Sequence, residues 1–537
     1  MTEQEQVSNE QLQFDPPKEL VAHHLDEIPL IFAKNVRDIE PKRGLSLHGP
    51  VDSKDEGPET IRVGIISSSE GIETVTNWII EFNDTPIYCD GEQPFLTQTF
   101  PGYVKAFNAR LVVSESFNEP LTRREISEIL GIKNPNLRIK RAAEKYASKV
   151  QIVARRTPHP DLIICHEPTD IEMKCGAGLT RFERNFGGIP KAARDEAERI
   201  RKRMEGVSIL FPLEQETIDL LDSSINQDFR AYLKAKTLEP ETPPIQILTE
   251  SVLKKMLRQP TEEKETNKIK RGSEDPSNIA WNLATGIYCK ANHLPWKVDN
   301  LKWGTCYVGI SFYFDKTSRS KDMQASLAQI FSDTGEGLVV RSNSFKWDLK
   351  SQGSPHLSYE SAFNLLNEAV EIYKIHHNDQ PPNRVVIHKK SSFDGEELEG
   401  FLRAIQDENV PKFDFLTLGT GSRDIFLYRN GDNPVLRGTS LTLNRGSHLL
   451  FTIGYIPYLN SYPHPRIPHA LEIREHHGDS SIEELSKEIL ALSRLNWNSA
   501  GYCSYWPVTL MFSQRVGDIL GRIDSKASIQ RNYYYYM

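Results

Sequence analysis

The segment IRVGIISS, Ile61 to Ser68, is short, rich in β-branched residues and bounded by polar residues, as a buried parallel strand is. A helical pattern from Glu73 to Phe82 follows it. The alternation continues with the strand-like segment ARLVVS, a basic helical stretch from Asn136 to Ala154, and the apolar segment PDLIICHEP. Strands that alternate with helices predict an α/β fold built on a layered sheet.

A second α/β lobe is expected after a charged, proline-containing junction, Arg258 to Ser277. The segments TCYVGISFYFD and GLVVRSNSF are predicted to be neighbouring strands of a mixed sheet. The strand RVVIHK and an amphipathic helix from Val508 to Leu520 complete this lobe. Two helices, Tyr359 to His376 and one near Gly395 to Glu408, belong to the same lobe.

The N-terminal part carries weaker signals. IPLIFA, Ile28 to Ala33, is strand-like, whereas RGLSLHGP, Arg43 to Pro50, is rich in turn residues. The charged helical stretch from Ala192 to Glu205 is expected to be a solvated insertion. These signals divide the chain into an N-terminal extension and linker strand (1–59), a first domain (60–275) and a second domain (276–537).

Composition limits the class of protein. The 537 residues are enough for about two to four domains. The lack of an apolar run of about 18 residues, with a mean hydropathy of -0.49, argues against a membrane span. The six cysteines are widely spaced with no CxxC pair, which argues against a zinc ribbon or a disulfide framework and fits a reducing, cytoplasmic location. The net charge of -8 is unusual for a nucleic-acid binder, unless the cations are clustered.

Eight segments, in this order, resemble short prokaryotic Argonautes. They extend from about residue 28 to residue 525 and read RGLSLHGP, IRVGII, FPGY, DFRAYLKAKTLEPETPPIQIL, NIAWNLATGIYCKANHLPW, VGISFYFD, RVVIHKKSSF and WPVTLMFSQRVGDIL. The resemblance implies a Rossmann-like MID domain followed by a ribonuclease-H-like PIWI domain. It also implies that N and PAZ domains are lacking.

The resemblance assigns four residues to a pocket for the 5′-phosphate of a guide strand: Arg230, Lys234, Gln246 and Lys290. Arg230 and Lys234 are spaced i, i+4 and therefore share one helix face. Cations that converge on a terminal phosphate form charge-assisted hydrogen bonds. A solvated basic helix face is the alternative reading of the Arg230–Lys234 pair. Many relatives carry a tyrosine where Arg230 stands, so charge is retained but base stacking is in question.

The resemblance also implies a divalent ion, Mg²⁺, at the guide 5′ end. The C-terminal carboxylate of Met537 would be one of its ligands, and a tyrosine-rich tail without such a role is the alternative. No catalytic metal is expected.

The catalytic carboxylates of slicing Argonautes are missing at the matching positions. Cleavage of this type needs carboxylates that hold two Mg²⁺ ions. The strand that begins the set reads VGIS and places Ser311 where an aspartate is needed, Lys389 and Lys390 follow RVVIH, and Gln514 is the candidate for the last position. A hydroxyl, a lysine and an amide cannot hold two dications, so the chain is expected not to be an enzyme.

The same region offers cations to a nucleic-acid backbone. His388, Lys389 and Lys390 are expected to face target phosphates, which would give affinity without sequence preference. An exposed basic run at a strand end is the alternative. Base pairing with the guide would supply the sequence specificity.

The partners implied by the resemblance are a guide, expected to be RNA, a complementary single-stranded DNA target, and an APAZ-domain effector protein. The effector would be a TIR or sirtuin-type NADase or a nuclease, with a higher oligomer possible on activation and no membrane involved. Two other functions remain open: an autonomous guided nuclease with a non-standard site, and an α/β protein that binds a small molecule.

Overall fold

The computed structural model describes most of the chain. The described residues are 20–54, 56–89, 98–176, 228–257, 274–299, 301–314, 322–331, 337–343, 345–346, 354–421, 425–443, 447–462, 467–523 and 527–537. The expected insertion helix, Ala192 to Glu205, lies outside these residues, as does most of the junction Arg258 to Ser277.

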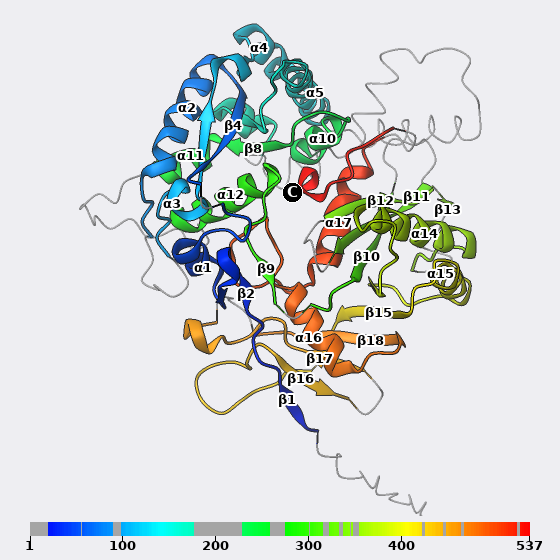
Figure 1. The fold of residues 1–537 in the computed structure, drawn as a ribbon. Coiled ribbons are helices and arrows are strands. Elements are labelled where there is room, and N and C mark those ends of the chain that lie inside the picture. Colours follow the sequence, from blue (N-terminus) through cyan, green and yellow to red (C-terminus); the bar gives the residue numbers. More distant parts are fainter. Residues whose placement is uncertain are drawn as a thin grey trace, which may run out of the picture.

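The first lobe is built on a parallel sheet of order β5-β4-β7-β8, with β6 beside β4 (Figure 1). Its strands are β4 Glu59–Ser67, β5 Ala109–Val113, β6 Glu119–Pro120, β7 Leu162–Glu167 and β8 Ile245–Thr249. Its helices are α2 Ser69–Asp84, α3 Tyr103–Phe107, α4 Arg123–Gly131, α5 Pro135–Ala154, α6 Thr169–Lys174, α10 Phe229–Lys236, α11 Glu250–Leu257 and α12 Pro276–Lys290, with the 3-10 turn η2 Glu115–Phe117. Helices α2, α3, α11 and α12 contribute to one apolar core and α5, α6 and α10 to another.

The second lobe is built on a mixed sheet of order β1-β16-β17-β18-β15-β14-β10-β11-β12, with β13 beside β11. Its strands are β1 Ala22–His24, β10 Thr305–Phe314, β11 Asp322–Phe331, β12 Gly337–Arg341, β13 Phe345–Lys346, β14 Arg384–Lys389, β15 Lys412–Thr420, β16 Thr439–Thr442, β17 His448–Leu450 and β18 Leu471–Gly478. Its helices are α14 Tyr359–His376, α15 Gly395–Asp407, α16 Ile482–Leu492 and α17 Val508–Leu520, with 3-10 turns η3 Pro457–Leu459 and η4 Tyr533–Tyr536. Helices α14 and α15 share one core with β10 and β14, whereas α17 packs against β10 and β11.

The strong patterns of the second lobe are confirmed. Helices α14 and α17 and strand β14 have the expected bounds. The expected pairing of TCYVGISFYFD with GLVVRSNSF is wrong, because β11 lies between β10 and β12 and pairs with both. Strand β11 was missed because its sequence, DMQASLAQIF, does not show the β-branched run that marked the other strands.

The N-terminal segment differs from the expectation in two places. RGLSLHGP is not a turn: α1, Pro41–His48, is a helix that starts with a proline at its first position and is capped by the Glu40 carboxylate, which accepts from the Arg43 amide. Only Leu30–Ile31 of the IPLIFA segment forms a strand, β2, because Lys34 and Asn35 adopt positive φ angles in the following turn η1, Ala33–Asn35. Strand β2 pairs with β3, Arg37–Asp38, and with β9, Lys297–Val298.

The expected domain boundary at residue 275 falls before α12. This helix contacts α11 and β8, which are elements of the first lobe, and its aromatic and aliphatic residues join the first-lobe core. Helix α12 is therefore part of the first lobe.

A buried ion triad attaches the N-terminal segment to the second lobe. The Glu27 carboxylate binds Arg437 (Nε to Oε2, 2.8 Å) and Arg494 (Nη1 to Oε1, 2.7 Å), and both guanidinium groups are almost fully buried. Burial raises the pKa of Glu27, but the two arginines outweigh burial and lower this pKa to about 2. Since two buried cations share one carboxylate, its removal leaves both uncompensated.

We expect Glu27→Gln to lower the free energy of unfolding by about 3 kcal/mol or more at pH 7. The depressed pKa means that the carboxylate stabilises the fold above its unfolded pKa, near 4.5, and that this contribution is lost as pH falls towards about 2. Denaturant unfolding of both proteins from pH 7 to pH 2 measures the effect, and the difference should shrink across that acid range. Glu483→Gln, which breaks an exposed pair with Lys487, is the control and should change stability little. A wild-type unfolding curve for Glu27→Gln would contradict the role of the triad.

Candidate functional site

The four residues expected to form a phosphate pocket come from three elements of the first lobe. Arg230 and Lys234 lie on α10, Gln246 on β8, and Lys290 is the last residue of α12. The Asp228 side chain caps α10 by accepting from the Ala231 amide at 2.8 Å. These elements meet at the start of β8, on the side of the first lobe that faces α17 (Figure 1).

The structure brings Gln246 and Lys290 into direct contact. The Lys290 ammonium donates to the Gln246 side-chain oxygen at 2.6 Å, and its side chain is only 3% exposed. The Lys234 ammonium donates to the main-chain oxygen of Tyr536 at 3.4 Å. Arg230 is exposed and lies close enough to influence the charge of both lysines.

Burial and mutual repulsion make these lysines less basic. Burial lowers the pKa of Lys290 to about 7, with Arg230 contributing in the same direction and Cys289 opposing it. Burial also lowers the pKa of Lys234 well below its ordinary value, and the charges of Lys290, Arg515 and Arg230 lower it further. The pocket thus brings together lysines whose charged forms are unfavourable as long as no anion lies beside them. An anionic group placed among them would restore their protonated state.

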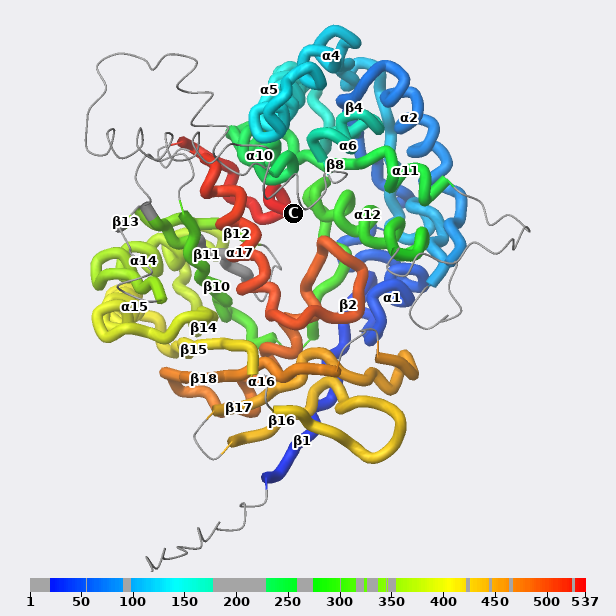
Figure 2. The backbone as a smooth tube through the Cα atoms, turned by 180° about the vertical axis from the view of Figure 1, so that it is seen from behind, coloured from blue at the N-terminus to red at the C-terminus, as the bar shows by residue number. Residues whose placement is uncertain are grey.

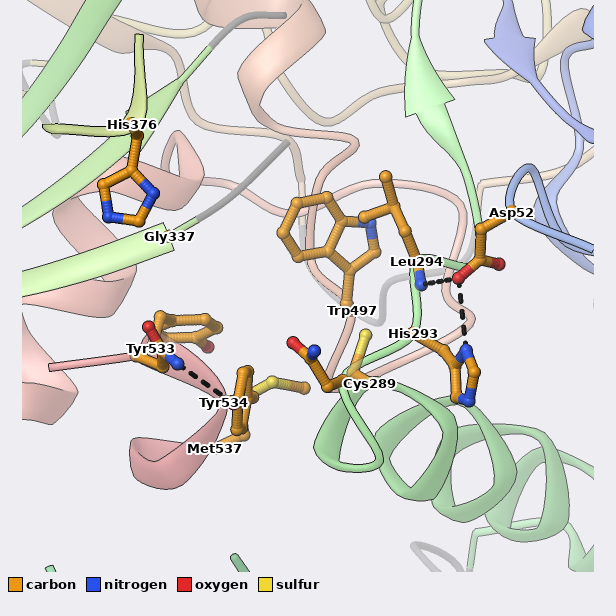
Figure 3. Close-up of a pocket in the computed structure, with 12 residues that line it drawn as sticks. Asp52, Cys289, His293, Leu294, Gly337, His376, Trp497, Tyr533, Tyr534 and Met537 are labelled. Carbon is orange, nitrogen blue, oxygen red and sulfur yellow. Dashed lines mark hydrogen bonds and ion pairs between the residues drawn. The ribbon is translucent and has the colours of Figure 1, made fainter. Parts of the chain in front are cut away.

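The C-terminus lies at the junction of the two lobes, among α10, α12 and α17, in both views of the chain (Figures 1 and 2). Met537 is buried, and the turn η4 packs against α12, α17 and β12. A cavity of about 350 Å³ lies beside this turn. Figure 3 shows Met537, Tyr533 and Tyr534 on one side of the cavity, with Trp497, Cys289 and the ion pair of Asp52 with His293 on the others.

The donor set for the expected Mg²⁺ ion is incomplete without a ligand. Mg²⁺ requires near-octahedral oxygen coordination, commonly from one or two carboxylates together with substrate phosphates. The resemblance assigns one ligand to Met537, and the Gln246 side-chain oxygen already accepts from Lys290. Guide phosphate oxygens would have to complete the coordination of such an ion.

The matching slicer positions lie within β10, at the end of β14 and on α17. Ser311 on β10 lies 2.8 Å from Ser513 on α17, oxygen to oxygen. The Lys390 ammonium, one residue beyond β14, donates to the Gln514 side-chain oxygen at 3.0 Å. Ser311, Lys390 and Gln514 therefore belong to the face of the sheet that α17 covers. Among the described residues, no group of three or more histidine, cysteine or acidic side chains is arranged to hold a metal ion.

The expectation that Lys389 faces the phosphates of a target strand is wrong. Side chains alternate between the faces of a strand, and Lys389 points to the opposite face from Lys390. Its ammonium is fully buried and forms an ion pair with Glu397 on α15, with a further bond to the Ser392 main-chain oxygen at 3.0 Å. Lys390, not Lys389, is the residue on the Ser311 face.

The expected contact of His388 with a nucleic-acid backbone is also wrong. Its ring is 1% exposed, and Nδ1 lies 2.8 Å from the Thr509 hydroxyl. Burial lowers the pKa of His388 to about 3, so the imidazole is neutral at pH 7. Of the three residues in this basic run, Lys390 alone remains exposed.

Two contributing residues were missed from the sequence. The charge of Arg515 lowers the pKa of Lys234. Arg515 directly follows Gln514, in the segment WPVTLMFSQRV that the sequence analysis had singled out. Trp506 lies under the Lys390 ammonium, 4.3 Å from ring centroid to nitrogen. Its place in the same segment, WPVTLMFSQRV, was the available signal.

No protein-family model matches the sequence, and no curated protein matches it. Solved structures do match. Clostridium butyricum Argonaute bound to a guide DNA and a 19-mer target DNA has a TM-score of 0.60 and 13% identity, over 95% of this chain and 54% of that one. Drosophila Piwi has a TM-score of 0.58 and 13% identity, over 96% of this chain and 56% of that one. Aa-Ago with externally bound siRNA has a TM-score of 0.51 and 14% identity, over 96% of this chain and 56% of that one.

These similarities show that the chain has an Argonaute-like fold, with a MID-like first lobe and a ribonuclease-H-like PIWI second lobe. The chain spans about half the length of the structures it matches. In the described part of the chain, no helix is both long and apolar enough to cross a membrane.

Proposed function

We propose that this chain binds a 5′-phosphorylated guide strand and recognises a complementary target without cleaving it. The observation that best supports this proposal is the contact between Lys290 and Gln246. Lys234 and Arg230 lie beside this contact, and Lys234 binds the main chain close to the C-terminus. A matching structure is bound to a guide DNA and a target DNA, which supports the same ligand class for this chain. By family resemblance the guide is RNA and the target is single-stranded DNA.

The energetics of the pocket support an anionic ligand. A buried lysine with a lowered pKa costs stability, because the folded protein either neutralises it or carries a poorly solvated charge. Lys290 is buried and Lys234 is half-buried, and burial lowers the pKa of both. A terminal phosphate would compensate both charges at once and form charge-assisted hydrogen bonds with them.

The proposal that the chain does not cleave rests on the residues at the matching slicer positions. Ser311 contributes a hydroxyl, Lys390 a cation and Gln514 a neutral amide. A two-metal mechanism needs carboxylates to hold its ions, and the Lys390 charge repels a dication. An autonomous guided nuclease with a non-standard site is the second candidate.

A chain that reads a target without cutting it needs an effector. We therefore propose that it acts with an APAZ-domain partner that carries an NADase of TIR or sirtuin type, or a nuclease, in a prokaryotic defence pair. The support is the set of residues at the matching slicer positions, Ser311, Lys390 and Gln514, which offers no carboxylate. The type of effector stays open.

We expect Lys234→Ala combined with Lys290→Ala to weaken binding of a 5′-phosphorylated guide at least about a hundredfold, since each charge-assisted bond contributes about 1.5–3 kcal/mol. Binding is measured with labelled guides that carry a 5′-phosphate or a 5′-hydroxyl, and the variant should lose the preference for phosphate. Lys236→Ala is the matched control, because Lys236 lies exposed on the same helix over the Tyr232 ring. Equal affinity of wild type for both guide ends would refute the pocket.

We expect the guide-loaded protein to return a matched, labelled target uncut in Mg²⁺ or Mn²⁺. Ser311→Asp should not restore cleavage, and neither should Ser311→Asp with Lys390→Asp unless further carboxylates are added, because two ions need more ligands than these. Denaturing gels of the target strand provide the measurement. A guide-directed cut by the wild type that disappears in Ser311→Ala would show instead that the chain is a nuclease.

We expect the isolated chain to have no NADase or nuclease activity, and these activities to need a second protein. Tagged chain purified from its native cells should carry the partner along. Target addition to that complex should then deplete NAD or degrade DNA, whereas the chain alone with guide and target should do neither. Activity of the chain alone would exclude an obligatory effector.

A further inference from the structure

Lys390 is held in an unusual setting for an exposed lysine. Its ammonium donates to the Gln514 side-chain oxygen at 3.0 Å and lies 4.3 Å above the centre of the Trp506 ring. An indole face attracts a cation through its quadrupole. The two contacts come from α17 and from the loop before it, so they fix the ammonium between the end of β14 and α17.

In the described part of the chain, the Lys390 ammonium contacts an amide oxygen and an aromatic ring rather than a carboxylate. Burial lowers the pKa of Lys390. Its contacts are an amide oxygen and an aromatic ring, which orient the ammonium without neutralising it. The hydroxyls of Ser311 and Ser513 belong to the same sheet–helix junction. A cation, an amide and hydroxyls are donors suited to a phosphate oxygen.

Helix α17 connects this setting with the proposed guide pocket. Gln514 contacts Lys390, and the next residue, Arg515, is exposed and lies close enough to Lys234 to lower its pKa. Consecutive residues of one helix therefore lie beside both cationic centres. Arg515 thus adds one cation of α17 next to the proposed guide pocket, one residue from the Gln514 side chain that contacts Lys390.

We infer that Lys390, positioned by Trp506 and Gln514, binds one backbone phosphodiester of the guide or of the target strand at the place where a slicing PIWI domain holds metal ions. This inference rests on the proposed function and adds a second phosphate site to it. The former cutting site would then act as a clamp on the strand. The clamp reads backbone charge and carries no base preference.

Neutral linkages locate the site. Guides and targets are synthesised with a single methylphosphonate, which removes the charge of one phosphodiester, and the position is moved along each strand in turn. Wild-type protein should lose affinity about three- to tenfold at one linkage or two adjacent linkages, on the strand that Lys390 contacts. In Lys390→Gln the same neutral linkage should cost nothing further, because the cation that sensed its charge is gone.

Salt dependence gives an independent readout. Loss of one phosphate contact should reduce the slope of log affinity against log salt by about 0.7–0.9. Lys390→Arg should keep most of the slope. Lys412→Gln is the matched control, since Lys412 is an exposed lysine at the first residue of β15, at the opposite end of the parallel strands from Lys390, and should leave slope and affinity unchanged.

The outcomes separate the two claims. If wild type binds guide and target but Lys390→Gln keeps the wild-type slope and the same methylphosphonate profile, the clamp is refuted and the proposed function stands. If wild type binds no nucleic acid, the proposed function fails and the clamp fails with it. An affinity loss in Lys390→Gln that is uniform over all neutral linkages, with an unchanged slope, would mark Lys390 as a structural residue only.

Discussion

The close contact of α17 with β10 is the constraint on which the second lobe depends. A Cβ atom at Gly309 would lie 2.2 Å from the Thr509 main-chain oxygen, so only glycine allows the helix to approach the strand so closely. This approach brings Ser513 to Ser311 and Thr509 to His388. It also fixes the direction in which the next residues of α17 point. The glycine of the VGIS segment is thus needed for packing, whatever residue follows it.

The resulting charge distribution is compatible with the proposed binding of a polyanion by an acidic chain. The net charge of -8 is an average over the whole surface, whereas binding depends on local potential. Arg230, Lys234 and Lys290 meet on one side of α17, and Lys390 lies beside its Gln514. Two other arginines, Arg437 and Arg494, are buried and bind the Glu27 carboxylate. The proposed binding thus depends on the positions of a few cations in the fold and not on the net charge of the chain.

Sequence patterns predicted the fold class and most long elements. The four residues that the resemblance assigned to a phosphate pocket lie close together in the structure, and their role stays a prediction. The patterns did not predict which face of strand β14 each side chain occupies, because this depends on how the strands pair. Strand β14 is buried on both faces, so its apolar run carries no alternation to show which face Lys389 or Lys390 would occupy. Pairing of β10 with β14 in parallel, Gly309 opposite His388, settles this and is invisible in a single sequence. The burial of Lys389 against Glu397 has the same origin, because the two are brought together by the packing of α15 on the sheet.

The C-terminal tail provides the physical link between the pocket and the second lobe. Gln530 donates its amide to the Leu238 main-chain oxygen in the first lobe at 2.9 Å, and the Arg531 main-chain oxygen accepts from Val339 on β12 at 2.8 Å. The next turn ends at Tyr536, whose main-chain oxygen accepts from Lys234. A phosphate that attracts the Lys234 ammonium competes with this bond, so it acts on a segment that is hydrogen-bonded to both lobes. The proposed pocket is therefore connected to the sheet of the second lobe by backbone hydrogen bonds of the C-terminal tail, at residues other than Ser311, Lys390 and Gln514.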